Sequence, residues 1–354
     1  MTFTVSITPS GKTVSIDDET HILEAALAQG VVLPYGCKNG ACGSCKARIV
    51  SGDIIQDPHQ PSALSADEAR RGYALLCCAR AASDLTVEAR VVAAVGEIPI
   101  RKMPCRVSSI DRVAPDVVVI RLQLPANERL QYLAGQYVDL LLRDGTRRSY
   151  SMAAAPGTAD GLELHVRHLP GGKFTDAAFG VSEPALKVRD ILRLEGPLGT
   201  FFLREDSDRP IVMIASGTGF APIKAILERV RGLVESKGFV RPIVLYWGGR
   251  RPQDLYMHEL CLRWESEIPG FRYLPVISEA LAQDGWTGRT GFVHRAAMAD
   301  FPDMSGCQVY ACGAPVVVDA SRRDFVGHCG LPDDEFYADA FTTAADMAIS
   351  PEGP

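Results

Sequence analysis

Four cysteines have a spacing that restricts this chain to a few possible sites. Cys37, Cys42 and Cys45 follow the pattern C-x4-C-x2-C, and Cys77 comes after a long gap. This is the ligand spacing of a plant-type [2Fe–2S] cluster. The glycines among the first three cysteines allow the backbone to approach inorganic sulfur and to point N–H groups at a negative cluster. The spacing therefore predicts a centre that carries single electrons, with these four cysteines as its ligands.

Zinc is the main alternative for the four thiols. Structural zinc sites usually combine two close pairs of ligands, whereas here three ligands share one loop and the fourth is distant, which favours the iron–sulfur interpretation. Disulfides are not expected, because residues 1–14 do not resemble a secretion signal, and we expect a reducing, cytoplasmic location. Cys78, adjacent to a ligand, is expected to be a packed small side chain.

The composition is that of an ordinary globular protein with more than one domain. The chain has 354 residues, 47% of them hydrophobic, and a net charge of −6. No apolar run approaches the ~20 residues of a membrane span, and no block of basic residues indicates nucleic acid. Membrane and nucleic-acid partners are therefore not expected. His165 and His168 fall in a strand-like segment and are interpreted as non-ligands of a metal.

Turn signals and apolar periodicity divide the chain into three domains. Residues 1–95 carry the cysteines and form a small α+β unit, with a strand around Phe3, Val5 and Ile7 and a helix at 22–29. Residues 96–103 form a linker. Residues 104–206 contain short strands that predict an antiparallel barrel, and residues 207–345 alternate strands and helices that predict a parallel α/β domain, followed by a tail at 346–354. The expected strands are 117–124, 137–142, 148–152, 162–165 and 191–194 in the barrel and 211–215, 243–247, 271–277 and 308–311 in the α/β domain, whose first helix is expected at 222–232.

A glycine-rich turn predicts a nucleotide site in the α/β domain. The segment 216–222, Ser-Gly-Thr-Gly-Phe-Ala-Pro, follows an apolar strand and opens a helix. Its glycines would allow the backbone to approach a pyrophosphate at the helix N-terminus, and Pro222 suits a first helical turn. By itself this pattern also fits a plain strand-to-helix turn.

Two segments of the barrel are suited to holding a flavin. Residues 148–151, Arg-Ser-Tyr-Ser, combine a phosphate-binding cation, an aromatic face and a hydroxyl group. Residues 171–175, Gly-Gly-Lys-Phe-Thr, add flexible backbone, a second cation and a hydroxyl group. Each segment alone is more often a strand or a turn, and their order ahead of the nucleotide turn favours the flavin interpretation.

These motifs together resemble those of a known superfamily. Residues 105–341 resemble the ferredoxin-NADP⁺ reductase superfamily, in which a barrel binds FAD through an R-x-Y-S motif and an α/β domain binds NAD(P)H. With a plant-type ferredoxin in front, the chain is similar to the reductase components of bacterial oxygenases, including the phenol and benzoate types. It resembles most the CDP-6-deoxy-Δ3,4-glucoseen reductases, which share the domain order, the double cysteine and the terminal Asp-Ala-Phe. The matching strings are residues 132–137, 148–151, 196–199, 217–222, 310–313 and 338–341.

The resemblance implies a β-grasp fold for the first domain and roles for individual residues. It implies catalytic roles for Ser151 and Cys312 and for Phe341, which would cover the flavin and yield to nicotinamide. Asp339 stands where many relatives have Glu, which makes its catalytic role an open question. The implied flavin-binding residues are Arg148, Ser149, Tyr150, Ser151, His165, Val166, Gly171, Gly172, Lys173, Phe174, Thr175 and Phe341. The implied nucleotide-binding residues are Gly217, Thr218, Gly219, Phe220, Pro222, Cys312 and Gly313.

Electron counting gives the order of the predicted centres. NAD(P)H gives up two electrons as a hydride and the cluster accepts one at a time, so the FAD must lie between them. The final acceptor is expected to be another protein, either a deoxysugar dehydratase or an oxygenase component. Lys38, Lys46 and Arg48 would offer it a positive rim. A non-catalytic relay or sensor with the same fold remains the alternative.

The choice of nucleotide stays open at this stage. Arg250 and Arg251 follow a predicted strand of the α/β domain, and arginines there can accept the 2′-phosphate of NADPH. Relatives with this domain order mostly use NADH, and we expect NADH with NADPH as the alternative.

Overall fold

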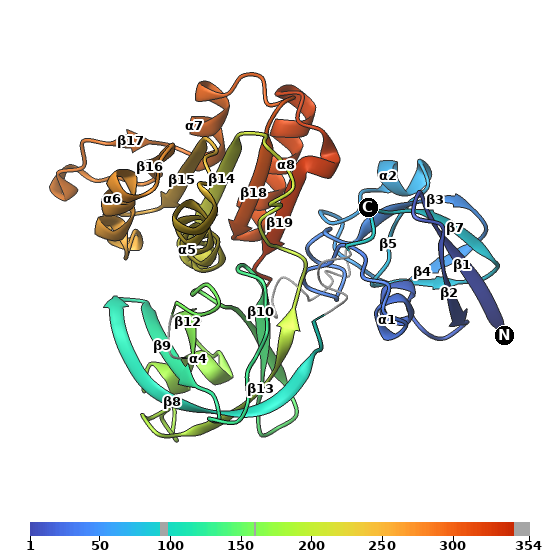
Figure 1. Ribbon diagram of the computed structural model, residues 1–354, viewed down its shortest axis with the longest axis horizontal. Helices are drawn as coiled ribbons and strands as arrows, with labels where there is room; N and C mark the ends of the chain where they lie inside the picture. The colour runs from blue at the N-terminus through green and yellow to red at the C-terminus, as the bar shows by residue number, and fades with distance from the viewer. Residues whose placement is uncertain (93–97, 159–160, 343–354) are drawn as a thin grey trace. The chain divides into compact units, whose positions relative to one another are not determined.

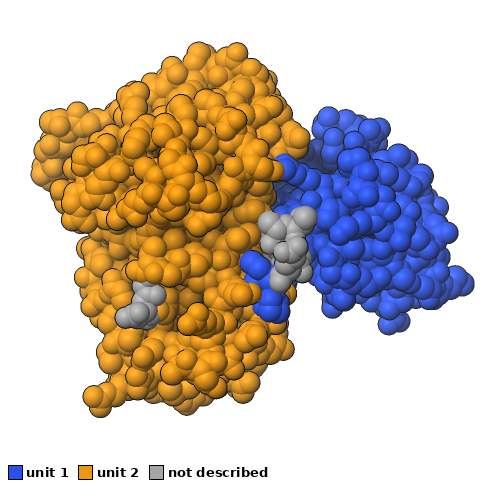
Figure 2. Space-filling view, viewed as in Figure 1, with its two compact units in different colours: residues 1–99, 339–354 blue, residues 100–338 orange. Residues whose placement is uncertain are grey.

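The computed structural model describes residues 1–92, 98–158 and 161–342, which belong to two compact units (Figures 1 and 2). Unit 1 contains residues 1–99 and the chain from Asp339 onward, and unit 2 contains residues 100–338. The predicted tail at 346–354 lies outside the described residues. Within the described ranges, no helix combines the length and the apolar character needed to cross a membrane.

Unit 1 is a mixed sheet with a helix packed on it, as expected for a β-grasp domain. Strand β1 pairs antiparallel with β2 and parallel with β7, in a sheet of order β2-β1-β7-β3-β5. The alternation that predicted β1 buries Val5 and Ile7 completely. Strands β4 and β6 form a separate pair. The elements are β1 (Thr2–Thr8), β2 (Lys12–Asp17), α1 (Ile22–Ala28), β3 (Lys46–Ser51), β4 (Ile54–Gln56), α2 (Ala66–Arg70), β5 (Tyr73–Leu75), β6 (Ala79–Ala81) and β7 (Leu85–Glu88).

The first half of unit 2 is a six-stranded antiparallel barrel. Its strands run in the order β11-β10-β13-β8-β9-β12. The two end strands meet at a bridge between Met152 and Leu164, where the N–H of Ala153 donates to the carbonyl of Glu163 at 2.8 Å. The barrel elements are β8 (Arg101–Ala114), β9 (Val117–Gln123), β10 (Tyr137–Leu141), β11 (Arg147–Ser151), β12 (Leu162–Arg167), α4 (Lys173–Ala178) and β13 (Ile191–Leu198).

Strand β8 differs from the sequence expectation. Residues 101–103 fall in the predicted linker but form the start of this strand, which pairs with β13 and then with β9. Pro104 lies inside β8 opposite Arg193, so this proline does not interrupt the strand. Met103, Cys105 and Val107 face the barrel core with the alternation typical of a strand.

The second half of unit 2 is a parallel α/β domain, as predicted. Its sheet has the order β17-β16-β15-β14-β18-β19, so β15, β16 and β17 are added on one side of β14 and the later strands β18 and β19 on the other. Because crossovers are right-handed, this reversal of strand order places α5 and α6 on one face of the sheet and α7 and α8 on the other (Figure 1). The elements are β14 (Ile211–Ser216), α5 (Phe220–Lys237), β15 (Ile243–Gly249), α6 (His258–Glu267), β16 (Phe271–Ile277), β17 (Arg289–Thr290), α7 (Val293–Asp300), β18 (Gln308–Gly313), α8 (Pro315–His328) and β19 (Phe336–Ala340).

Helix α5 is longer than the sequence suggested. It begins at Phe220, directly after the 3-10 turn Gly217–Gly219, and ends before Gly238, whose φ of +64° closes the helix. Pro222 is accommodated because N–H groups in the first turn have no partner within the helix. Gly232, the predicted end, lies inside the helix with open space around it.

Candidate functional site

The four predicted cluster ligands come together in unit 1 as two pairs. Three lie in the irregular chain between α1 and β3, and Cys77 follows β5. A contact with the thiol of Cys42 lowers the pKa of Cys37, and a contact with Cys45 raises the pKa of Cys77. Cys37 is half-buried and the other three are buried. The pairs are therefore Cys37 with Cys42 and Cys45 with Cys77.

This pairing fits a binuclear cluster better than a single ion. A [2Fe–2S] cluster takes two thiolates on each of its two irons, which two separate pairs can supply. The arrangement therefore favours the iron–sulfur interpretation over zinc.

The loop backbone is arranged to stabilise negative sulfur. Lys38, Gly40 and Gly43 have positive φ angles of 62°, 76° and 72°. The N–H groups of Asn39 and Ala41 add to the effect of Cys42 in lowering the pKa of Cys37. Amides that converge in this way form an anion-binding concavity, which suits a negatively charged cluster.

Two residues of the predicted positive rim have acidic partners. Lys46 Nζ lies 2.6 Å from Glu68 Oε1, and its side chain is only 11% exposed. Arg48 lies 3.9 Å from Glu88 and is more than half exposed. The ion pair therefore reduces what Lys46 can offer a partner protein, and the docking role of the rim stays a prediction.

The Arg-Ser-Tyr-Ser segment forms β11, beside the line where the barrel closes. Arg148 and Tyr150 are half-buried, Ser149 is exposed and Ser151 is buried. The ring of Tyr150 packs on Phe174 with a centroid distance of 5.4 Å, so the two predicted flavin segments meet in space. His165 and Val166 lie on β12, the other end strand of the barrel.

The Gly-Gly-Lys-Phe-Thr segment opens the short helix α4, which the sequence analysis did not predict. The hydroxyl of Thr175 accepts from the N–H of Leu169 at 3.2 Å and donates to its carbonyl at 2.9 Å. The ammonium of Lys173 pairs with Asp144 and lowers the pKa of that carboxyl. Thr175 thus shapes the loop itself, and Lys173 is already paired.

The nucleotide turn and the end of β18 are in direct backbone contact. A Cβ atom at Gly219 would lie 2.2 Å from the carbonyl oxygen of Cys312, and one at Gly313 would lie 2.4 Å from that of Ser216. Only glycine fits at these two positions, because each meets backbone atoms. The structure therefore brings the predicted nucleotide residues of both loops together at the reversal of strand order, where α/β sheets bind ligands.

Asp339 and Phe341 lie at the end of β19, the last strand of the parallel sheet, where the segment assigned to unit 1 begins. Asp339 is buried in β19, next to β18 in the sheet, and Phe341 follows the end of this strand and is half-buried.

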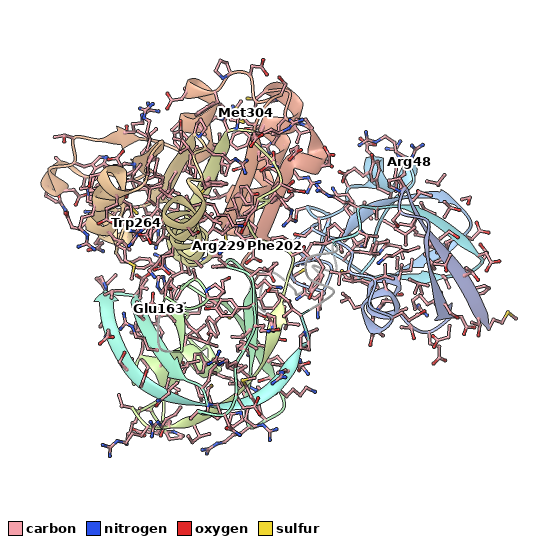
Figure 3. All side chains as sticks on the ribbon, viewed as in Figure 1. Arg48, Glu163, Phe202, Arg229, Trp264 and Met304 are labelled. Carbon is pink, nitrogen blue, oxygen red and sulfur yellow. The ribbon has the colours of Figure 1, made fainter. Side chains whose placement is uncertain are left out.

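Several polar residues around the nucleotide turn escaped the sequence analysis. A Cβ at Gly217 would lie 2.6 Å from a guanidinium nitrogen of Arg167, the last residue of β12. Arg167 also bonds Asp116 and Asp254. Glu163, labelled in Figure 3, lies between the barrel and the α/β domain and pairs with Lys224 of α5 at 3.0 Å. Glu163 and Arg167 alternate with apolar residues of β12, which was the available sequence signal.

Three protein families match successive parts of the chain. The 2Fe-2S iron-sulfur cluster binding domain matches residues 5–82, the oxidoreductase FAD-binding domain residues 104–203 and the oxidoreductase NAD-binding domain residues 213–323.

Individual relatives match over nearly their whole length. The CDP-6-deoxy-L-threo-D-glycero-4-hexulose-3-dehydrase reductase of Yersinia pseudotuberculosis is 40% identical, over 96% of this chain and 99% of the relative. Reductase component 1 of terephthalate 1,2-dioxygenase from Comamonas is 35% identical, over 91% and 92% of the two chains. The crystal structure of the Amycolatopsis cytochrome P450 reductase GcoB matches with a TM-score of 0.72 and 34% identity, over 97% and 99% of the chains.

Each matched domain thus contains one of the sites described above. These sites are the paired thiols, the barrel with its Arg-Ser-Tyr-Ser strand, and the glycine turn at the reversal of strand order. The predicted fold class and cofactor set, a [2Fe–2S] cluster, FAD and NAD(P)H, are confirmed. The chain belongs to the family of NAD(P)H-dependent iron–sulfur flavoprotein reductases that deliver electrons to partner proteins.

Proposed function

We propose that this chain is the NADH-driven reductase of a CDP-6-deoxyhexulose 3-dehydrase. The observation that carries the proposal is the 40% identity to such a reductase across 96% of this chain. The double cysteine Cys77-Cys78 and the terminal Asp-Ala-Phe at 339–341 support it. A reducing, cytoplasmic location suits the ten free cysteines.

The described residues supply the binding groups that this function needs. When bound, FAD accepts a hydride and releases its electrons singly, which links NADH to a one-electron centre. Arg148 would hold an FAD phosphate, Tyr150 would pack on the flavin ring and Ser151 would hydrogen-bond its edge. The N–H groups of the turn Gly217–Gly219 would bind the nucleotide pyrophosphate.

Further roles concern the nicotinamide and the cluster. Cys312 and Gly313 would border the nicotinamide, and Phe341 would cover the flavin until NADH arrives. The role of Asp339 stays a prediction. Cys37, Cys42, Cys45 and Cys77 would hold the two irons.

Reconstitution with purified acceptors tests the proposal. Under nitrogen, NADH should bleach the flavin absorbance and then the cluster absorbance. The reduced protein should then support turnover of a CDP-6-deoxy-L-threo-D-glycero-4-hexulose-3-dehydrase with its sugar nucleotide. Failure of NADH to bleach either centre would instead indicate a non-catalytic relay.

A second candidate is the reductase component of an aromatic-ring oxygenase. The 35% identity to a terephthalate dioxygenase reductase favours it. Parallel assays with the oxygenase component of that system separate the two candidates. Coupling of NADH oxidation to the oxygenase but not to the dehydrase would overturn the first assignment.

A further inference from the structure

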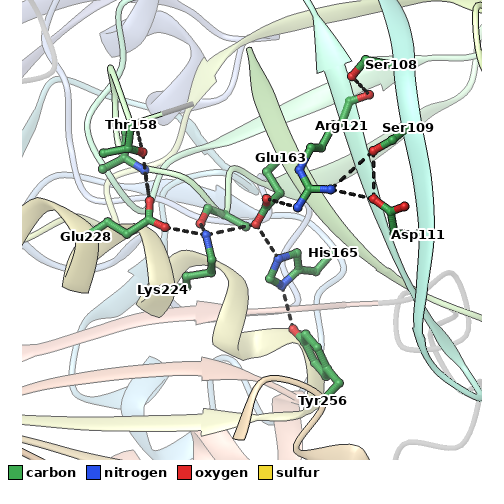
Figure 4. A network of polar contacts seen from close by, with 12 residues as sticks. Ser108, Ser109, Asp111, Arg121, Thr158, Glu163, His165, Lys224, Glu228 and Tyr256 are labelled. Atoms are coloured by element: carbon green, nitrogen blue, oxygen red, sulfur yellow. Dashed lines mark hydrogen bonds and ion pairs between the residues drawn. The ribbon is translucent and has the colours of Figure 1, made fainter. Parts of the chain in front are cut away.

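A buried polar network joins the flavin-binding barrel to the nucleotide-binding helix (Figure 4). Its centre is Glu163 on β12, whose side chain is 8% exposed. Oε1 of Glu163 lies 3.0 Å from both His165 Nε2 and Lys224 Nζ. Oε2 lies 3.1 Å from Arg121. We call Glu163, His165, Lys224 and Tyr256 the interdomain clamp.

Lys224 contacts three acceptors in this network. Besides its ion pair with Glu163, it donates hydrogen bonds to Glu228 at 2.6 Å and to the carbonyl of Ala153 at 3.0 Å. Glu228, one turn further along α5, accepts from the N–H of Ala155 at 2.8 Å. The start of α5 is therefore bonded to the chain that directly follows the Arg-Ser-Tyr-Ser strand.

His165 extends the clamp to the nucleotide turn. Its Nδ1 lies 2.8 Å from the hydroxyl of Tyr256. The ring of Tyr256 meets Trp247 edge-on, with centroids 5.2 Å apart, and Trp247 Nε1 donates to the carbonyl of Gly217 at 3.1 Å. A continuous series of contacts thus leads from β12 to the backbone that would bind the nucleotide.

The chemistry of the clamp gives it one arrangement. Burial lowers the pKa of His165, which favours the neutral ring with one N–H. Because an ionised Glu163 can only accept, the ring donates from Nε2 and accepts the Tyr256 hydroxyl at Nδ1. Buried ion pairs add little stability over apolar pairs of the same shape, but a fully satisfied network is rigid.

We propose that the interdomain clamp positions the nucleotide turn against the flavin site, so that Glu163, His165 and Lys224 are positioning residues for hydride transfer. This inference rests on the proposed reductase function. Hydride donor and acceptor must approach to about 3–3.5 Å, and a displacement of about 1 Å can cost on the order of 100-fold in rate. The barrel carries one reactant and α5 follows the turn that binds the other.

The test is rapid-mixing measurement of flavin reduction by NADH in the full-length holoprotein. Glu163→Gln should lower the limiting rate of flavin reduction by about 10- to 100-fold, with little change in the NADH concentration that gives half the limiting rate. The FAD content should stay at the wild-type value. When the flavin is reduced by light instead of NADH, the cluster should also be reduced at the wild-type rate. Lys224→Met should behave in the same way, and Lys224→Arg should recover part of the rate.

A matched control is His168→Gln. His168 also pairs with a carboxylate on the barrel, Asp176 at 2.9 Å, but it lies outside the clamp. Its flavin reduction rate should equal that of the wild type. If Glu163→Gln fails to bind FAD, Tyr256→Phe removes one hydrogen bond only and should still slow the reaction several-fold.

Two outcomes would overturn the clamp proposal. One is a wild-type limiting rate in folded, FAD-loaded Glu163→Gln and Tyr256→Phe. The other is a rate that falls only in proportion to lost FAD. Failure of the wild-type protein itself to react with NADH would instead contradict the proposed function.

Discussion

Arg251 and Asp284 form a two-point ion pair beside the carboxyl ends of β15 and β16, with Arg251 Nε 2.9 Å from Asp284 Oδ2. The contact lowers the pKa of Asp284. Arginine at this end of the second strand is the residue that would accept the 2′-phosphate of NADPH. In this chain its charge is already matched by a carboxylate, which would repel that phosphate.

We therefore expect Asp284→Asn to shift the nucleotide preference toward NADPH. The ratio of kcat/KM for NADPH to that for NADH should rise by about tenfold, because a charge-assisted hydrogen bond is worth about 1.5 kcal/mol or more. Asp333→Asn, which breaks the similar Arg322–Asp333 pair, serves as the control and should leave the ratio unchanged. An unchanged ratio in Asp284→Asn would refute this role.

Replacing one thiol of the Cys37–Cys42 pair should separate the two halves of the reaction. Cys42→Ser should lose the cluster absorbance and electron delivery to a protein acceptor but keep NADH oxidation by small dyes. The reason is that dyes take electrons from the flavin directly. The Cys307→Ser variant, altered far along the chain from the ligands, should keep both activities. Loss of dye reduction in Cys42→Ser would show that the division of labour is wrong.

Cys78 should tune the cluster without binding it. Its Sγ lies 3.6 Å from Cys77 Sγ, and a ligand thiolate can only accept, so Cys78 must donate. Hydrogen bonds to ligand sulfur favour the more negative, reduced cluster. Cys78→Ala should therefore lower the midpoint potential measured by EPR-monitored titration, and Cys78→Ser should lower it less. An equal potential in Cys78→Ala and in the control Cys105→Ala would contradict this expectation.

Arg241 should be a strong determinant of the stability of unit 2. It is 3% exposed, and its guanidinium donates to the carbonyls of Arg209 and Arg204 and to Gln308 Oε1, each at 2.9 Å. Arg241→Ala removes the donor to both carbonyls and one of the two donors to Gln308 Oε1, which should cost about 3 kcal/mol and lower Tm by roughly 6–12 °C. Arg231→Ala removes only an exposed pair with Glu267 and should cost less than about 1 kcal/mol. Calorimetry on both variants gives the comparison.

The buried groups around Glu163 should make unit 2 sensitive to acid. Burial lowers the pKa of His165 in the folded chain. Below the ordinary pKa of histidine, near 6.5, the unfolded chain therefore binds a proton that the folded chain does not. The free energy of unfolding consequently decreases as the pH is lowered. Burial alone would raise the pKa of Glu163, but His165 and Lys224 lower it to about 2, so its contribution is lost between about pH 4 and pH 2. The charged and titratable groups that face this pair are Arg121, Lys224, Glu228 and Tyr256.

The corresponding measurement is Tm as a function of pH. The decrease from pH 7 to pH 5 should be smaller in His165→Gln than in the wild type. A parallel decrease in both proteins would show that His165 does not contribute.

Local sequence patterns predicted many of the helices and strands. They did not predict contacts between residues that are far apart in the sequence. The strand at 271–277 was predicted with the bounds that β16 has, because it continues the alternation of strands and helices typical of a parallel α/β domain. Strand β8 was not predicted, because Pro104 and the residues before it were interpreted as a linker, although Met103, Cys105 and Val107 alternate around the proline. The alternation carried more information than the proline.

The site shows the same division between local and distant information. The cysteines and the glycine turn are local motifs, so the sequence identified them as candidates. The partners Lys46–Glu68 and Arg251–Asp284 are 22 and 33 residues apart, and only folding brings them together. The ion pair of Lys46 was not predicted for this reason, since the sequence shows the charge of Lys46 but not which carboxylate lies beside it.

The contact between Gly219 and Cys312 makes the nucleotide loop intolerant of even one added methyl group. Alanine at 219 would press the turn after β14 away from the end of β18, since the obstacle is the carbonyl oxygen of Cys312, 2.2 Å away, which cannot rotate aside. Gly219 is thus a position of this loop where substitution is strongly restricted, although its side chain is only a hydrogen atom.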